Sequence, residues 1–177
     1  MNEQVVLGID IGGTNTVYGL ITKDGNVVHH ESIPTNGSLP ITDLLNRLNS
    51  KVNEALSNYP EIEKIIGVGI GAPNGNHFTG MIQDPPNLSW GNVDVNTLFS
   101  KTFECEVDLT NDANAAALGE KHFGFAKDME DFVVITLGTG LGSGIFCGGR
   151  LLYGHDGFAG EMGHICIEVD GRPVSYT

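Results

Sequence analysis

The feature that most constrains the fold is a pattern of apolar strand, glycine-rich turn and apolar strand that occurs twice. The first copy begins at Val5 and reads VVLGIDIGGTNTVYGLITKDGNVV, and the second begins at Phe132 and reads FVVITLGTGLGSGIFCGGRLL. Apolar, β-branched runs separated by Gly-rich turns favour antiparallel hairpins. Two such copies, far apart along the chain, predict two related lobes.

The first copy predicts a three-stranded antiparallel meander, which comprises Val5–Asp10, Thr16–Thr22 and Val27–Ile33, with Asp24-Gly25 as a hairpin turn. The apolar residues from Ile41 to Leu56 then recur at helical spacing, which predicts an amphipathic helix. Ser38 is the expected cap of that helix. A meander followed by a helix is typical of an α/β domain.

The run KIIGVGIGAP is short and apolar, which predicts a buried parallel strand and hence a mixed sheet. Asn74–Trp90 is expected to form a long irregular loop, and Glu106–Leu109 a brief strand. A helix is expected from Asn111 or Asp112 to just before Gly124. We expect a first lobe over residues 1–115 and an incomplete second lobe over residues 116–177, since the second copy of the pattern has little chain after it.

The net charge of the chain limits the classes of partner that it is expected to bind. The 177 residues include 9 Lys and Arg against 22 Asp and Glu, for a net charge of −13. An acidic surface disfavours nucleic acid and anionic membranes as partners. Three widely spaced cysteines and no visible signal peptide are typical of a reduced, cytoplasmic protein.

The stretch DIGGTNT in the first turn carries groups that suit phosphate binding. Gly12 and Gly13 allow a close approach of the backbone, whose amides can point at phosphate oxygens. Thr14 and Asn15 add further donors, and Asp10 can hold Mg²⁺ directly or through water. The alternative is a plain hairpin turn, because paired glycines are common there.

The second turn, TLGTGLGSGI, has glycines at alternate positions, so one face of this β segment has no side chains. Thr136 and Thr139 can donate hydroxyls to phosphate. The alternative is a glycine-rich bend that packs against another backbone. The alternating glycines are Gly138, Gly140, Gly142 and Gly144.

Two further stretches suit the recognition of a sugar. In TNDANAAALGE, Asp112 can act as a general base beside a hydroxyl, with Asn111 on a neighbouring hydroxyl, or Asp112 can simply cap a helix. In FAGEMGHI, Glu161 and His164 are three residues apart and share a face of a helical turn. Glu161 can accept bonds from two hydroxyls and His164 can bind a sugar or a metal, although an ordinary exposed turn would show the same pair.

Together these stretches, with GIGAPNG and PPNLSW between them, resemble the ROK family of sugar kinases and sugar-sensing repressors, particularly its bacterial glucokinases. The resemblance implies an actin/hexokinase-like ATPase (ribonuclease H-like) fold and ATP-dependent phosphorylation of a hexose. It implies that the partners are a hexose and Mg·ATP, and it suggests a homodimer. In the family a zinc ion is also expected, although the cysteines that would ligate it have no counterparts in this sequence.

By this resemblance, Asp112 is the catalytic base. The sugar contacts are Asn111, Asp112, Glu161, His164, Gly71 and Asn74. The groups around the ATP phosphates are Asp10, Gly12, Gly13, Thr14, Asn15, Gly138, Thr139, Gly140 and Gly142. Asp10 holds Mg²⁺, and His164 is the expected zinc ligand.

Two alternatives remain beside a kinase. The repressors of the family carry a DNA-binding segment ahead of the first phosphate loop, whereas only about seven residues precede Gly8 here. A non-catalytic actin-like ATP-binding module, or an inactive fragment, is the other alternative. We expect the chain to be the N-terminal portion of a kinase and to be inactive by itself.

Overall fold

A computed structural model describes residues 3–138 and 140–171. The elements fall into two compact units, one up to Asn111 and one from Asp112 onwards. The lobe boundary expected after residue 115 stays a prediction. Of the expected site residues, Thr139 lies outside the described part of the chain.

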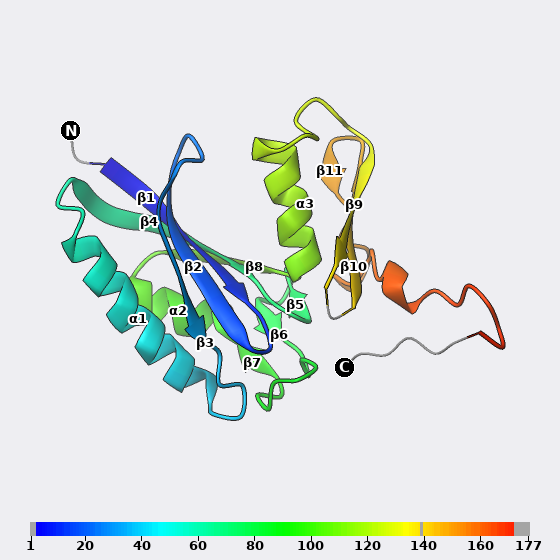
Figure 1. Cartoon of the computed structure of the whole chain (residues 1–177), viewed down its shortest axis with the longest axis horizontal. Helices are drawn as coiled ribbons and strands as arrows, with labels where there is room; N and C mark the ends of the chain where they lie inside the picture. The colour runs from blue at the N-terminus through cyan, green and yellow to red at the C-terminus, as the bar shows by residue number, and fades with distance from the viewer. Residues whose placement is uncertain (1–2, 139, 172–177) are drawn as a thin grey trace. The chain divides into compact units, whose positions relative to one another are not determined.

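The first unit is built on a mixed sheet of five strands in the order β3-β2-β1-β4-β8 (Figure 1). The chain runs antiparallel through β1, β2 and β3, and β4 and β8 add to the sheet in parallel with β1. This confirms the predicted meander and the predicted parallel strand. The strands are β1 (Glu3–Ile11), β2 (Asn15–Thr22), β3 (Val27–Pro34), β4 (Ile62–Gly71) and β8 (Glu106–Thr110).

Helix α1 (Ile41–Ser57) confirms the predicted amphipathic helix, and its apolar stripe is buried at Ile41, Leu44, Leu45, Leu48, Val52 and Ala55. The expected cap was wrong. Pro40 is the N-cap, with an extended backbone (ψ 145°) and no side-chain cap bond. Ser38 lies two residues earlier, so its hydroxyl does not cap the start of the helix.

The segment expected to be an irregular loop holds short strands, β5 (Gly75–Asn76) and β6 (Met81–Ile82), which pair with β7 (Val93–Asp94) in a small antiparallel sheet. Helix α2 (Val95–Phe103) follows and was not predicted. Asp94 caps α2, because its carboxylate accepts the amide of Thr97 at 2.9 Å.

The large hydrophobic core cluster lies wholly within the first unit, between the sheet and helices α1 and α2. Its largest fully buried side chains include Tyr18, Phe99, Leu7, Ile11, Leu20, Leu44 and Leu48. None of the helices in the described part of the chain has the combined length and apolar character that crossing a bilayer requires.

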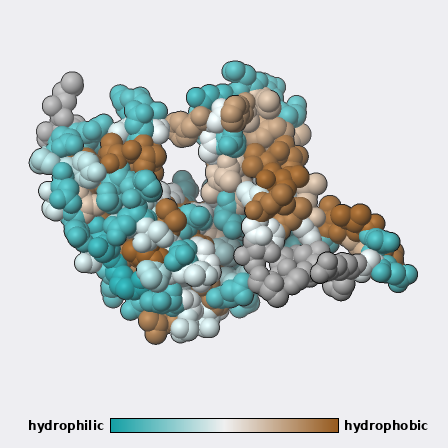
Figure 2. All heavy atoms as spheres, viewed as in Figure 1, coloured by the Kyte–Doolittle hydropathy of each residue, from teal (hydrophilic) through white to brown (hydrophobic). Residues whose placement is uncertain are grey.

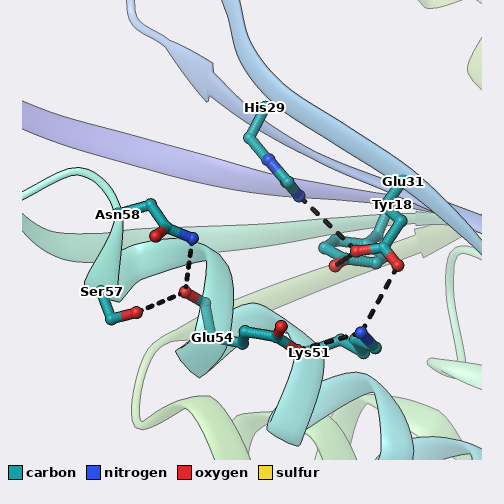
Figure 3. Close-up of polar contacts among 7 residues, drawn as sticks. All are labelled: Tyr18, His29, Glu31, Lys51, Glu54, Ser57 and Asn58. Carbon is teal, nitrogen blue, oxygen red and sulfur yellow. Dashed lines mark hydrogen bonds and ion pairs between the residues drawn. The ribbon is translucent and has the colours of Figure 1, made fainter.

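A polar cluster ties α1 to the outer strands of this sheet (Figure 3). The buried Tyr18 on β2 donates its phenol hydrogen to Glu31 on β3 at 2.8 Å. Lys51 on α1 lies 3.7 Å from the same carboxylate and 2.9 Å from Glu54. The Tyr18 hydrogen bond, aided by the charge of Lys51 and opposed by desolvation, lowers the pKa of Glu31 below its ordinary value.

This contact predicts a dependence of stability on acid pH. A depressed carboxyl pKa contributes stability above the ordinary glutamate pKa of about 4.3, and this contribution is lost as the pH falls through the lower value in the folded chain. Tyr18→Phe removes the main cause of the shift. We expect the urea midpoints of wild type and Tyr18→Phe to differ most at pH 7 and to converge towards pH 3.

Glu31→Gln should abolish the same pH-dependent part, because the amide does not titrate. The side chains of His29 and Lys51, which also lie beside Glu31, stay in place in both variants. Curves for wild type and Tyr18→Phe that run parallel from pH 7 to pH 3 would contradict the assignment.

In the second unit, helix α3 (Asp112–Phe123) precedes a three-stranded sheet in the order β11-β10-β9. The strands are β9 (Phe132–Leu137), β10 (Leu141–Cys147) and β11 (Arg150–Leu151), and a 3₁₀ turn, η1 (Met162–His164), follows. Both the helix and the second copy of the strand and turn pattern are thereby confirmed.

One face of this small sheet packs on α3 at its glycines. A Cβ at Gly144 would lie 2.5 Å from the Cβ of Ala117 and 2.9 Å from the carbonyl oxygen of Ala113. The opposite face of β9 exposes Val133, Ile135 and Leu137, and Figure 2 shows hydrophobic surface over β9. The helix therefore covers one side of the sheet, and the glycines let it approach closely.

The close packing predicts different effects at two glycines of the same sequence motif, Gly144 in β10 and Gly138 in the turn before it. Gly144→Ala should lower the free energy of unfolding by about 1–3 kcal/mol, because overpacking forces the helix away from β10. Gly138→Ala is the matched control, since nothing lies within 4 Å of a Cβ there. Urea unfolding monitored by circular dichroism measures both, and equal losses would contradict this packing.

Candidate functional site

The carboxyl ends of β1, β4 and β8 meet at one edge of the first sheet. The strand register places Asp10 beside Gly71 and Gly71 beside Thr110. In α/β sheets of this kind, ligands bind at the carboxyl ends of the parallel strands. Asn111 follows Thr110 directly, so three of the predicted site residues, Asp10, Gly71 and Asn111, belong to this edge or follow it at once. Asp112 begins the next helix.

The predicted first phosphate loop connects β1 to β2 at the same edge. The amide of Gly12 donates to the carbonyl of Asn15 at 2.9 Å, and Gly13, Thr14 and Asn15 are exposed. A Cβ at Gly12 would come within 2.8 Å of the Asn15 carbonyl oxygen, so this turn requires a glycine there. The loop is tight, and its tip is open to solvent.

Few of the predicted site residues have side chains that suit a metal ion. Asp10 places an exposed carboxylate at the end of β1, which suits Mg²⁺, an ion often held by one or two carboxylates together with substrate phosphates. Structural zinc needs about four ligands. The described residues contain no group of three or more His, Cys, Asp or Glu side chains that could hold a metal, so the donors around His164 do not fit zinc.

Asn74 has a structural task in the loop after β4. Its backbone is in the left-handed region (φ 53°). Its side-chain amide donates to the carbonyls of Gln83 and Asp84 at 3.0 and 3.1 Å. The amide of Gln83 returns a bond to the Asn74 carbonyl at 3.2 Å. Asn74 therefore shapes this loop, and its contact with a sugar stays a prediction.

Asp112 is the first residue of α3 and is exposed. Its Oδ1 atom accepts the amide of Ala113 at 2.8 Å, so the carboxylate holds the first turn of the helix. A carboxylate has further acceptor capacity when one lone pair is used in this way. The bond to the Ala113 amide and the role of a general base are thus compatible.

The glycines of the second glycine-rich turn have different surroundings along its length. Gly142 and Gly144 face α3, where a Cβ at Gly142 would lie 3.0 Å from the Cβ of Ala113. Close packing therefore accounts for these two glycines without a ligand. Gly138 has open space around it, and its amide bonds the carbonyl of Gly140 at 3.0 Å. Phosphate binding by Gly138, Gly140 and Gly142 stays a prediction.

The structure places the stretch FAGEMGHI beside the glycine-rich stretch TLGTGLGSGI. The hydroxyl of Ser143 bonds the carbonyl of Gly160, and a Cβ at Gly163 would meet the carbonyl of Leu141. Glu161 and His164 share one face of the turn, with their side chains 3.8 Å apart and 45% and 66% exposed. Two motifs separated in sequence thus lie together, as a common site would require.

Thr35 is a residue that the sequence analysis missed. It follows β3 and is 1% exposed, and it contacts the first glycine loop through both its backbone and its side chain. No local motif marks it. Only the pairing of β2 with β3, which brings residue 35 level with the loop, would have identified it.

Comparison with known proteins finds relatives of two kinds. The chain is 34% identical over 176 residues to a glucokinase of Halalkalibacterium halodurans, an alignment that covers 97% of this chain and 52% of the relative. It is also 34% identical to a xylose repressor of Caldicellulosiruptor bescii, over 92% of this chain and 41% of that protein. The chain spans about half the length of the curated relatives it matches.

Among solved structures, the chain is similar to a ROK family glucokinase from Streptomyces griseus in complex with glucose and AMPPNP. The TM-score is 0.78 and the identity 32%, and the match covers 94% of this chain and 52% of that one. This likeness confirms the expected actin/hexokinase-like α/β fold. Residues 6–175 also match the sequence model of the ROK family. The chain therefore belongs to the ROK family.

Proposed function

We propose that this chain is the N-terminal portion of an ATP-dependent hexose kinase of the glucokinase type. The observation that carries the proposal is the strand register that sets Asp10, Gly71 and Thr110 side by side, with Asp112 two residues further along. The similarity to a glucokinase over 97% of the chain supports a hexose as the acceptor. A cytoplasmic location and a homodimer belong to the same proposal.

In the proposed reaction, Asp112 accepts the proton of the hexose 6-hydroxyl as its oxygen attacks the γ-phosphorus of ATP. The new oxygen–phosphorus bond forms while the bond from the γ-phosphorus to the bridging oxygen breaks, and ADP leaves with that oxygen. When bound, Mg²⁺ would offset phosphate charge beside Asp10. The loop amides of Gly12 to Asn15 would hold phosphate oxygens.

The sugar would be held by side chains from several segments. Asn111 stands next to the base in sequence and would bind a neighbouring hydroxyl. Glu161, as an ionised carboxylate, would accept two hydroxyl hydrogens, and His164 would offer a ring nitrogen. The contact between Glu161 and His164 supports a joint role for them.

A sugar-responsive repressor is the second candidate, which the similarity to a xylose repressor favours. A repressor would bind sugar without transferring phosphate. A non-catalytic ATP-binding module would bind Mg·ATP without a sugar. A kinase portion would bind both ligands, so calorimetry of the chain with glucose and with Mg·ATP separates the three.

The kinase proposal predicts a specific effect of Asp112→Asn. We expect turnover from a chimera in which this chain is continued by the C-terminal half of the H. halodurans glucokinase. In that chimera Asp112→Asn should lower kcat roughly 10²–10⁴-fold, the usual contribution of a general base. Glucose affinity, measured by calorimetry, should change by no more than about twofold, because an amide still hydrogen-bonds a hydroxyl.

The matched control is Asp108→Asn, the same chemical change at an exposed aspartate of β8. It should leave both kcat and glucose affinity unchanged. If Asp112→Asn and wild type phosphorylate glucose at equal rates in the chimera, Asp112 is not the base.

A further inference from the structure

Thr35 lies directly against the predicted first phosphate loop although it belongs to none of the sequence motifs. It follows β3 and is almost fully buried, beside the equally buried Thr16 of β2. A buried polar side chain costs free energy unless it is hydrogen-bonded. The bonds that Thr35 makes therefore indicate what this position does.

Thr35 holds two carbonyls of the loop at once. Its backbone amide donates to the carbonyl of Thr14 at 2.8 Å. Its hydroxyl donates to the carbonyl of Gly12 at 2.7 Å. The hydroxyl also lies 2.9 Å from that of Thr16, and since a hydroxyl has one hydrogen to donate, Thr16 is the donor in that bond. The Thr35 hydroxyl thus makes two bonds in a fixed direction.

The direction of these carbonyls fixes the direction of the loop amides. In a trans peptide, the carbonyl and the N–H of the same plane point opposite ways, and the described residues contain no cis bond. The carbonyls of Gly12 and Thr14 point to Thr35. The N–H groups of Gly13 and Asn15, which share those two planes, therefore point away from Thr35, and both residues are exposed.

Thr35 is itself held from the other side by α1. Arg47 donates from Nη2 to the Thr35 carbonyl at 3.1 Å and from Nη1 to the Pro34 carbonyl at 2.7 Å. The Nε of Arg47 is paired with Asp43 at 2.8 Å. The guanidinium, bound on several sides, thereby joins the helix to the segment that orients the loop.

We propose that Thr35 is a positioning residue, which turns two loop carbonyls inward so that the amides of Gly13 and Asn15 face an anionic oxygen. Backbone amides of a turn that face one point can bind an anion, and a carbonyl turned the same way would repel one. That the anion is a nucleotide polyphosphate rests on the proposed kinase function. The orientation of the amides rests on the bonds of Thr35 alone.

The test uses the whole ¹⁵N-labelled chain with two substitutions at one site. Thr35→Val keeps the shape but loses the hydroxyl, whereas Thr35→Ser keeps the hydroxyl. Without ligand, we expect Thr35→Val to shift the Gly13 amide resonance, since its nitrogen is bonded to the released Gly12 carbonyl. The Gly12 amide should also exchange about tenfold faster, as the loss of one hydrogen bond allows. Thr35→Ser should match wild type in both measurements.

Titration with Mg·AMPPNP adds the ligand. We expect it to perturb the Gly13 and Asn15 amides of wild type, and the Kd to rise about tenfold in Thr35→Val and less than twofold in Thr35→Ser. If wild type shows no perturbation, the proposed ATP site fails for this chain while the measurements without ligand still decide the role of Thr35. If Thr35→Val does not fold, the amides that Mg·AMPPNP perturbs in wild type decide whether those of Gly13 and Asn15 face the anion.

Thr22→Val is the matched control, because it removes another buried threonine hydroxyl, at the far end of β2, that accepts the amide of Asn26 at 3.2 Å. It should leave the Gly13 and Asn15 amides unchanged. The proposal is overturned if Thr22→Val alters these amides as Thr35→Val does, or if Thr35→Val leaves them as in wild type. Perturbation by Mg·AMPPNP at other loops alone would also overturn it.

Discussion

The pairing of β1 on both of its sides is the interaction on which the first unit depends. Strand β1 is antiparallel to β2 and parallel to β4, and its buried residues Val5, Leu7 and Ile9 face the core. A slip of one residue would turn these side chains to the other face of the sheet and lose their burial. The same burial therefore fixes the place of Asp10 at the edge where the candidate site begins.

Much of this arrangement could be predicted because its apolar residues recur at clear strand or helix spacing. The apolar β1 and the stripe of α1 bury side chains at the spacing of a strand and of a helix, so pattern and burial coincide. The Asp24-Gly25 turn could be predicted equally well, and Gly25 adopts a positive φ of 83°. The edge that gathers Asp10 and Gly71 follows from placing these strands in parallel.

The parts that escaped prediction depend on contacts between distant residues. Helix α2 has nine residues, too few for propensity alone to identify it, and it is stabilised by packing of Val95 and Phe99 in the core. The Thr16–Thr35 bond spans 19 positions and exists only because β2 and β3 pair in one register. The role of the alternating glycines was ambiguous for the same reason. The sequence alone does not show whether a helix or a ligand packs against the face that lacks side chains.

Bonds from side chains to the backbone hold each candidate loop, and this affects how function can be assigned. Both amide hydrogens of Asn74 are engaged with loop carbonyls, so a substitution there would disturb the loop together with any ligand. Asp112 differs, because an asparagine retains the Oδ1 acceptor for the Ala113 amide. Replacement by asparagine thus removes the basic carboxylate and preserves the start of α3, whereas replacement by alanine would remove both.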